Sequence, residues 1–348
     1  MSKAKQWYVG IDAHKGSSSV CVMDVTGRVF LEQTCSSQPA HLISLLENLA
    51  GEKDVVIEET TIADFLYRCL RPYARSVVVA SPRHNALLAE DDNISDQISA
   101  QKLATLLRMN CIKPVYHPLS ELRHEFKSLV LFRDGQNCSL VRFRNKFKAI
   151  FGSYLIPCEG SAVYGQQQRQ QWLDKLPYRS ARFRVQELYE QIDDALASVD
   201  RTDKEIAHQA RRFPEIELFK QLPGIGPVRA ATWFAIIDTP DRFERRSHLW
   251  AYCGLGIVRR KSANEAGPQH LNRNGNPMLK NVLKSAAVQA IGKGDHNRFQ
   301  RQFERLLSDH VPEAKARLTV ARSIATTMHT MWRTGEDYQD DYKPRCLR

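Results

Sequence analysis

Three acidic residues lie in or beside apolar segments, where a carboxylate needs a cation or a hydrogen-bond donor, and together they suggest a metal site. Asp12 interrupts the apolar segment VGIDAHK, Glu58 ends the apolar run VVIEE, and Asp96 opens the helix-like segment SDQISAQKLATLL. An acid inside an apolar strand is costly unless it is solvated, paired or bound to a cation. Converging carboxylates of this kind could hold Mg²⁺ or Mn²⁺, and two ions about 4 Å apart stabilise the attacking and leaving oxygens of phosphodiester cleavage.

Each acid also has a local alternative. Asp96 could cap a helix or lie in its first turn, where carboxylates are favoured in any case. A second acid three residues later would share its helix face, but Ser99 occupies that position. The order of Asp12, Glu58 and Asp96 along alternating strands and helices favours a shared metal site over three separate local roles.

A serine that follows three cations is the second candidate for chemistry. Ser262 comes directly after Arg259, Arg260 and Lys261. Neighbouring cations favour a hydroxyl as nucleophile towards a phosphodiester, because they stabilise the negative charge that develops. The alternative is a surface serine that only contacts a phosphate, and the local sequence leaves both roles open.

The segment LPGIGPVRAATWFAII, Leu222 to Ile237, has the spacing of a helix-hairpin-helix. Its glycines permit a tight turn whose N–H groups can meet a phosphate at the start of the next helix, although a plain connection between helices is the alternative. Residues 242–284, which follow, carry nine basic residues against two acids. The expected nucleic-acid contacts are Gly224, Gly226, Arg259, Arg260, Lys261, Arg273 and Lys280.

The elements that must position these residues form two different kinds of structure. Two strands within Trp7 to Asp24, a third at Arg28 to Thr34, and then alternating helices and strands to Met109 predict an α/β domain with a mixed sheet of the ribonuclease-H type. A basic helical segment follows, and then a mainly α C-terminal domain. The predicted boundaries are 1–115, 116–212 and 213–338, with a tail at 339–348.

A seven-residue spacing runs through the middle segment. Apolar residues recur every three or four positions from Val185 to Ile206, with a polar break at Asp203. Such a seam fits a coiled-coil hairpin or a dimer contact, and equally a long amphipathic helix packed within its own chain.

Composition restricts the class of partner. The 348 residues carry a net charge of +11 and a pI near 9.3, which favours a polyanion such as nucleic acid. The sequence offers no signal peptide and no apolar run long enough to span a membrane. Its eight cysteines are widely scattered, which excludes a CxxC zinc knuckle and predicts reduced thiols in a cytoplasm.

Taken together, these motifs resemble the IS-one-ten family of insertion-sequence transposases, with its IS-eleven-eleven branch and the related Piv DNA invertases. VGIDAHK, VVIEETT and SDQISAQKLATLL are similar to its RuvC-like DEDD domain. The stretches LPGIGPVRAATWFAIIDTPDRF, LWAYCGLGIVRRKSA and GNPMLKNVLKSAA are similar to its C-terminal transposase domain.

The resemblance implies a role for each matching residue. Asp12, Glu58 and Asp96 match the first three metal-binding acids, and Ser262 stands where the family has a catalytic serine that forms a covalent link to DNA. The resemblance also implies double-stranded DNA as substrate, a structured guide RNA (a bridge RNA) and a dimer to tetramer. Two positions depart from the family pattern: Ser99 replaces its fourth acid, and Ala263 replaces the glycine after the serine.

Three functions remain open from the sequence. The first is a metal-dependent recombinase with Ser262 as nucleophile, in which Asp91 or Asp92 could compensate for Ser99. The second is a nucleic-acid-binding relative whose catalysis is impaired by Ser99. The third is an ATPase related to sugar kinases, since its fold also opens with a GID segment, but the phosphate-binding loop expected in the second half is not apparent.

Overall fold

The computed structural model describes residues 5–81, 96–118, 120–262, 265–272, 274–292, 294 and 296–340, with only the backbone given at 96, 97, 258–262 and 265–269. The chain divides into two compact units, Met1–Leu119 and Ser120–Arg348. Asp91, Asp92, Arg273 and the residues after 340 lie outside the described part, as do the side chains of Asp96, Arg259, Arg260, Lys261 and Ser262.

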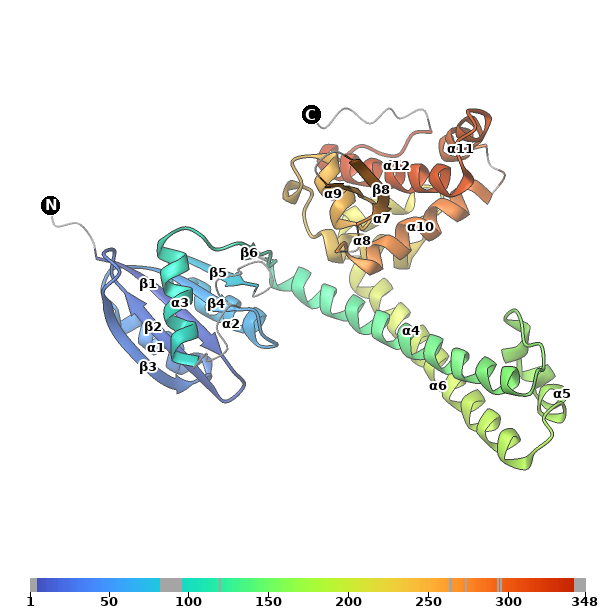
Figure 1. Ribbon diagram of the computed structural model, residues 1–348, viewed down its shortest axis with the longest axis horizontal. Coiled ribbons are helices and arrows are strands. Elements are labelled where there is room, and N and C mark those ends of the chain that lie inside the picture. The colour runs from blue at the N-terminus through green and yellow to red at the C-terminus, as the bar shows by residue number, and fades with distance from the viewer. Residues whose placement is uncertain are drawn as a thin grey trace. The chain divides into compact units, whose positions relative to one another are not determined.

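The first unit is built on a six-stranded sheet in the order β3-β2-β1-β4-β5-β6 (Figure 1). Its strands are β1 (Gln6–Ala13), β2 (Ser17–Met23), β3 (Val29–Ser36), β4 (Glu52–Glu58), β5 (Ser76–Ala80) and β6 (Pro114–Val115). Short turns make β1, β2 and β3 antiparallel neighbours, whereas β4 and β5 follow helices and run parallel to β1. The mixed sheet predicted from the sequence is therefore confirmed, and β6 is an addition to it.

Helices cover both faces of this sheet. On one face, α1 (Pro39–Asn48) and α2 (Ala63–Leu70) pack their leucines against Val9, Ile11, Val55 and Ile57, and η1 (Arg71–Tyr73) extends α2. On the other face, α3 (Asp96–Arg108) packs against Cys21, Met23 and Val56. Because strand side chains alternate between faces, Gly10 and Asp12 face the opposite way from Val9 and Ile11.

The second unit begins with a helical hairpin formed by α4 (Glu121–Ser153) and α6 (Arg179–Ala210) (Figure 1). At the far end of the hairpin, η4 (Ala162–Tyr164), η5 (Gln166–Gln168) and α5 (Arg169–Asp174) close a small core around Phe147, Phe151 and Tyr189. Asp193 binds Arg169 through both carboxylate oxygens, at 2.6 and 2.7 Å, and so ties this end to α6.

The predicted heptad seam lies on α6 and faces α4 of the same chain. Five of its apolar positions are buried: Val185, Tyr189, Ile192, Val199 and Ile206. Leu196 is 40% exposed. The polar break at Asp203 is explained by α4, since Arg133 donates to both carboxylate oxygens of Asp203 at 2.8 and 3.1 Å. The seam is therefore used within one chain, in a hairpin.

The rest of the second unit is mainly helical. It contains α7 (Pro214–Lys220), α8 (Pro227–Ile237), η6 (Pro240–Arg242), α9 (Arg246–Tyr252), α10 (Pro277–Gly292), α11 (Arg298–Ser308) and α12 (Glu313–Thr334), with a two-stranded sheet of β7 (Ile257–Ser262) and β8 (Glu265–Leu271). Every residue of α8 from Ala230 to Ile237 is buried, as expected for a helix that is apolar on all sides. Phe126, Val130, Ile206 and Ala210 of the helical hairpin belong to this same core.

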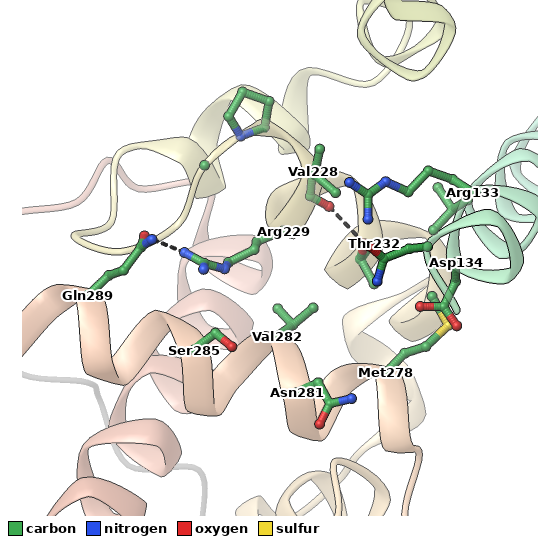
Figure 2. A pocket seen from close by; sticks show the side chains of 14 residues that line it. Arg133, Asp134, Val228, Arg229, Thr232, Met278, Asn281, Val282, Ser285 and Gln289 are labelled. Atoms are coloured by element: carbon green, nitrogen blue, oxygen red, sulfur yellow. Dashed lines mark hydrogen bonds between the residues drawn. The ribbon is translucent and has the colours of Figure 1, made fainter. Parts of the chain in front are cut away.

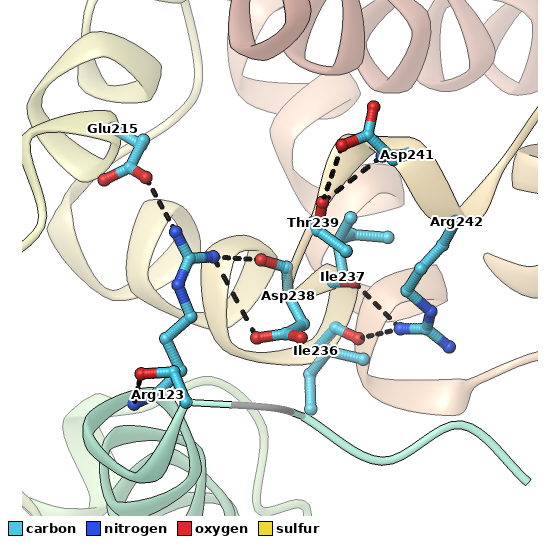
Figure 3. A network of polar contacts seen from close by, with 9 residues as sticks. Arg123, Glu215, Ile236, Ile237, Asp238, Thr239, Asp241 and Arg242 are labelled. Carbon is cyan, nitrogen blue, oxygen red and sulfur yellow. Dashed lines mark hydrogen bonds and ion pairs between the residues drawn. The ribbon is translucent and has the colours of Figure 1, made fainter. Parts of the chain in front are cut away.

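A polar network fastens the start of α4 to this core (Figure 3). Arg123 donates to Glu215 Oε1 at 2.9 Å and to the carbonyl oxygen of Asp238, and its guanidinium lies 4.6 Å from the centre of the Phe234 ring. Arg242 donates to the carbonyl oxygens at the end of α8, at 2.8 and 2.9 Å. Two arginines thus satisfy carbonyl groups that the end of a helix leaves without partners.

Candidate active site

Asp12 and Glu58 lie at the ends of neighbouring parallel strands. The register of β1 and β4 pairs Gly10 with Val56 and Ile11 with Ile57, and Asp12 and Glu58 are the next residues on the two strands. Adjacent strands are about 4.8 Å apart, and paired residues of parallel strands point to the same face. Asp12 is 4% exposed and Glu58 is half-buried. The sheet therefore brings these two predicted ligands together.

Helix α3 covers the face of the sheet to which both acids point. Gly10, two residues before Asp12, lies against α3 so closely that a Cβ there would come 2.1 Å from the carbonyl oxygen of Ala100. Val56, two residues before Glu58, packs against Leu103 of α3. Only glycine at position 10 permits this approach, which brings the helix backbone onto the strand that carries Asp12.

The direction of α3 decides which of its ends lies near the two acids. Towards its C-terminal end, Thr105 Oγ1 lies 3.6 Å from the sulfur of Met23, whose partner on β1 is Tyr8. Ala100 lies instead against Gly10, further along β1. The helix therefore runs antiparallel to β1, and its N-terminal end is directed towards the end of β1 that carries Asp12.

Asp96 is the first residue of α3, one turn before Ala100 on the same helix face. Its backbone is thus at the end of the helix that is directed towards the strand acids. Ser99 is half-buried on the same helix. Among the side chains that the structure describes, which do not include that of Asp96, no three His, Cys, Asp or Glu residues form a group that could hold a metal ion.

His14 is a neighbour of this site that the sequence reasoning missed. Its Nε2 lies 3.5 Å from Oδ1 of Asp12, and its side chain is 52% exposed. The backbone N–H of His14 donates to the carbonyl oxygen of Ser17 in the turn between β1 and β2. The signal was present in the segment IDAHK, because residues two apart at the end of a strand share a face.

The segment Leu222 to Ile237, predicted as a helix-hairpin-helix, forms the tight turn that follows α7 and then α8. Gly224 has a φ of +83°, and a Cβ there would lie 2.3 Å from the carbonyl oxygen of Ala286 on α10. Gly226 precedes Pro227, the first residue of α8, and a Cβ on Gly226 would meet no atom within 4 Å. Gly224 is therefore needed for close packing, whereas the space beside Gly226 is open.

Ser262 is the last residue of β7, in an antiparallel pair with β8 that we call the serine hairpin. Ser262 pairs with Glu265 across this hairpin. The side chain of Ser262 and those of the three preceding cations are not described, so the structure gives the position of their backbone only. Lys280, another predicted contact, is half-buried on α10.

The base of the serine hairpin is held by the surrounding helices. Arg322 of α12 donates through Nε to the carbonyl oxygen of Leu255 at 2.9 Å, and its guanidinium lies 5.5 Å from the centre of the Trp250 ring. Burial lowers the pKa of Arg322. Gly275 fits directly against Gly254, since a Cβ on Gly275 would come 2.3 Å from the Cα of Gly254. The backbone just before β7, the strand that carries Ser262, is therefore held in place by these contacts.

The two buried cysteines of the described residues, Cys21 and Cys253, show no sign of activation. Burial raises the pKa of Cys21 to about 12, with the nearby Glu32 adding to the effect. Burial also raises the pKa of Cys253, against a smaller opposing effect of Arg242. Such thiols stay protonated near neutral pH and are poor nucleophiles. The chemistry of this chain is better sought at its carboxylates and hydroxyls.

Comparisons with known proteins identify the family of this chain. Residues 9–156 match the model of the DEDD transposase domain of the IS110 group, and residues 216–304 match the model described as "Transposase IS116/IS110/IS902 family". A search of curated proteins gives no match. No helix in the described part of the chain has the length and apolar character that crossing a membrane requires. The first match contains the strand acids and α3, and the second contains the α7–α8 turn and the serine hairpin. The chain belongs to the IS110 (IS-one-ten) family and is an insertion-sequence transposase.

Proposed function

We propose that this transposase cuts and rejoins DNA with two sets of groups: the carboxylates of Asp12, Glu58 and Asp96, and the hydroxyl of Ser262. The observation that supports this most is the arrangement of the first unit. The paired register of β1 and β4 ends one residue before Asp12 and Glu58, at one end of the sheet, and α3 begins towards that same end.

The donor set fits a hard divalent cation. Carboxylate oxygens from Asp12, Glu58 and Asp96 are the ligands that Mg²⁺ and Mn²⁺ prefer, and Ser99 would add an uncharged hydroxyl. Bound there, such a cation would stabilise negative charge on the phosphodiester oxygens. His14 contacts Asp12 from the solvent side and helps to fix the orientation of its carboxylate.

Ser262 would supply the nucleophile. Its Oγ loses a proton and forms a bond to phosphorus, while the bond from phosphorus to one deoxyribose oxygen breaks and that oxygen takes up a proton. Three neighbouring cations, Arg259, Arg260 and Lys261, favour the step because they stabilise the charge that develops on the phosphate. The fixed base of the serine hairpin limits how far the hydroxyl can move.

Nucleic acid would be held mainly through its backbone. The open space beside Gly226 at the start of α8 permits close approach of a phosphate, and Arg273 and Lys280 would add positive charge. Contacts of this kind carry little sequence information. A guide RNA that pairs with the double-stranded DNA would supply it, in an oligomer of two to four chains.

Two matched substitutions test the proposal in a strand-exchange assay with element ends, target DNA and guide RNA. Asp12→Asn should abolish cleavage and weaken Mg²⁺ binding, whereas Glu47→Gln, at an exposed position on α1, should change neither. Ser262→Ala should abolish strand exchange while DNA and RNA binding survive, with Ser308→Ala, exposed at the end of α11, as its control. Full activity of Asp12→Asn or Ser262→Ala would remove that residue from the mechanism.

A second candidate function is favoured by Ser99, which brings no charge where the family has an acid. In this case the chain binds nucleic acid but recombines poorly. The variant Ser99→Asp distinguishes the two candidates. A large gain in recombination would show that the wild-type site is impaired. If the wild type is already active and Ser99→Asp brings no gain, the wild-type site works with its serine.

A further inference from the structure

A polar pocket in the second unit adjoins Gly226 and is lined otherwise by residues that the proposed function does not use. It has a volume of about 580 Å³ and is lined by α8 and α10, with α4 closing one end (Figure 2). We call it the α8–α10 pocket. Sites for small organic ligands usually measure about 300–1,000 Å³, so the α8–α10 pocket is large enough for one nucleotide.

Arg229 supplies an uncompensated positive charge in this pocket. It donates to the carbonyl oxygen of Gly224 at 2.7 Å and to Oε1 of Gln289, both through Nη1. No carboxylate of the described residues forms an ion pair with Arg229, and burial lowers its pKa. A guanidinium has five N–H donors, so Arg229 keeps donors for an anion, and phosphate is the anion that its planar fork matches well.

Asp134 supplies the opposite charge from α4. Its half-buried carboxylate lines the pocket and has no hydrogen bond or ion pair within the described part of the chain. Arg133 beside it is bound instead to both carboxylate oxygens of Asp203. Figure 2 shows Asp134 near one end of the pocket and the pair Arg229 and Gln289 towards the other.

The surface between the two charges is mixed. Val228 and Val282 from the two helices, together with Met278, provide apolar area, and Asn281 and Ser285 provide polar groups. A ligand that fits has an anion at one end, a middle with both apolar and polar surface, and N–H donors at the other end. A carboxylate accepts two parallel hydrogen bonds, so two adjacent donors suit Asp134 best.

We propose that the α8–α10 pocket binds one unstacked guanine nucleotide, with its phosphate at Arg229 and its Watson–Crick edge at Asp134. Guanine alone among the common bases presents two adjacent donors, N1–H and the N2 amino group, on that edge. Adenine and cytosine place an acceptor beside their amino group, which would face the second carboxylate oxygen. The inference rests on the proposed function as a nucleic-acid enzyme and adds a site that selects a base.

Titration calorimetry of the full-length protein with mononucleotides tests this site. GMP should bind about tenfold or more tightly than inosine monophosphate, which lacks only the N2 amino group, and more tightly than AMP, because a hydrogen bond to a charged group is lost. GMP should likewise exceed guanosine, which lacks the phosphate. Comparison of GMP with dGMP, and of short ribo- and deoxyribo-oligonucleotides that contain one guanine, identifies whether RNA or DNA supplies the nucleotide.

Two variants test which residue contacts each end of the ligand. Asp134→Asn should bring the affinities for GMP and inosine monophosphate to within about twofold, and its control Asp194→Asn, exposed on α6, should leave the difference intact. Arg229→Gln should bring GMP close to guanosine, with exposed Arg184→Gln as control. Because Arg229 also donates to the carbonyl oxygen of Gly224, its substitution could disturb the turn before α8. The Asp134 variant and the comparison of nucleotides on the wild-type protein do not depend on that contact.

Two outcomes would overturn the site: no saturable binding of GMP at millimolar concentration, or a preference for GMP that Asp134→Asn leaves unchanged. Strand exchange measured on the same preparations separates this inference from the proposed function. An active protein without guanine preference contradicts only the pocket. An inactive protein that still prefers GMP contradicts the catalytic proposal and leaves the pocket standing.

Discussion

Gly10→Ala tests how closely α3 must lie against β1 for the acids to work together. A Cβ at position 10 would stand 2.1 Å from the carbonyl oxygen of Ala100 and 2.6 Å from the backbone nitrogen of Ala104, where real Cβ atoms essentially never come under 3.0 Å. Both neighbours are backbone atoms, so no side-chain rotation can relieve the contact. The helix must move from the sheet by about 1 Å, and its first residue, Asp96, must move with it.

Two losses of different kind should follow. Overpacking of this sort costs about 1–3 kcal/mol of unfolding free energy. A displacement of about 1 Å between catalytic groups costs about 100-fold in rate, so DNA cleavage should fall by about that factor. The measurements are urea unfolding and a single-turnover cleavage assay at saturating Mg²⁺.

Gly16→Ala is the matched control. Gly16 belongs to the turn between β1 and β2, and a Cβ there would meet nothing within 4 Å. This variant should therefore unfold and cleave like the wild-type protein. If Gly10→Ala kept both its stability and its cleavage rate, the close approach of α3 would not be what positions the acids.

Two further predictions concern stability. Burial raises the pKa of Asp54, but hydrogen bonds from Arg75, Ser76 and Gln6 outweigh this effect and hold the pKa below its ordinary value. The resulting stabilisation is present above about pH 4 and is lost as the pH falls through the lower pKa of the folded state. Urea unfolding at several pH values should therefore show a steeper loss of stability in acid for the wild type than for Asp54→Asn. An equally steep loss in the variant would rule out this role for Asp54. Asp203→Ala should destabilise the helical hairpin by about 1 kcal/mol, because it removes a bidentate, partly buried pair with Arg133, whereas Asp200→Ala should cost close to nothing, since its partner Lys204 is 75% exposed. Equal losses from these two substitutions in urea unfolding would contradict the importance of burial.

Local patterns in the sequence predicted the first unit well. The apolar segments around Asp12 and Glu58 alternate or run continuously as half-buried and buried strands do, and the segment after Asp96 repeats with helical spacing. Because the ends of neighbouring parallel strands meet at one edge of a sheet, the sequence could place Asp12 and Glu58 at adjacent strand ends, as they are in the fold. The closeness of α3 depends on Gly10, whose requirement becomes visible only when Ala100 is placed against it.

Features that depend on contacts between residues far apart in the sequence were harder to predict. The serine hairpin was not predicted, because its strands combine cations with glycine and proline and show no regular alternation. In the sequence Asp203 only interrupts the apolar seam. In the fold it accepts a hydrogen bond from Arg133, which lies 70 residues earlier on α4. The charges of the α8–α10 pocket come from α4 and α8, and only the folded chain brings Asp134 and Arg229 to one cavity.

Binding of Mn²⁺, followed by electron paramagnetic resonance, tests the central claim that three carboxylates share a divalent cation. The wild-type protein and the exposed control Glu47→Gln should immobilise Mn²⁺ equally, and Mg²⁺ should displace it. Asp12→Asn, Glu58→Gln and Asp96→Asn should each weaken that binding by about tenfold or more, since each removes a charged ligand. Unchanged Mn²⁺ binding in all three variants would contradict the account.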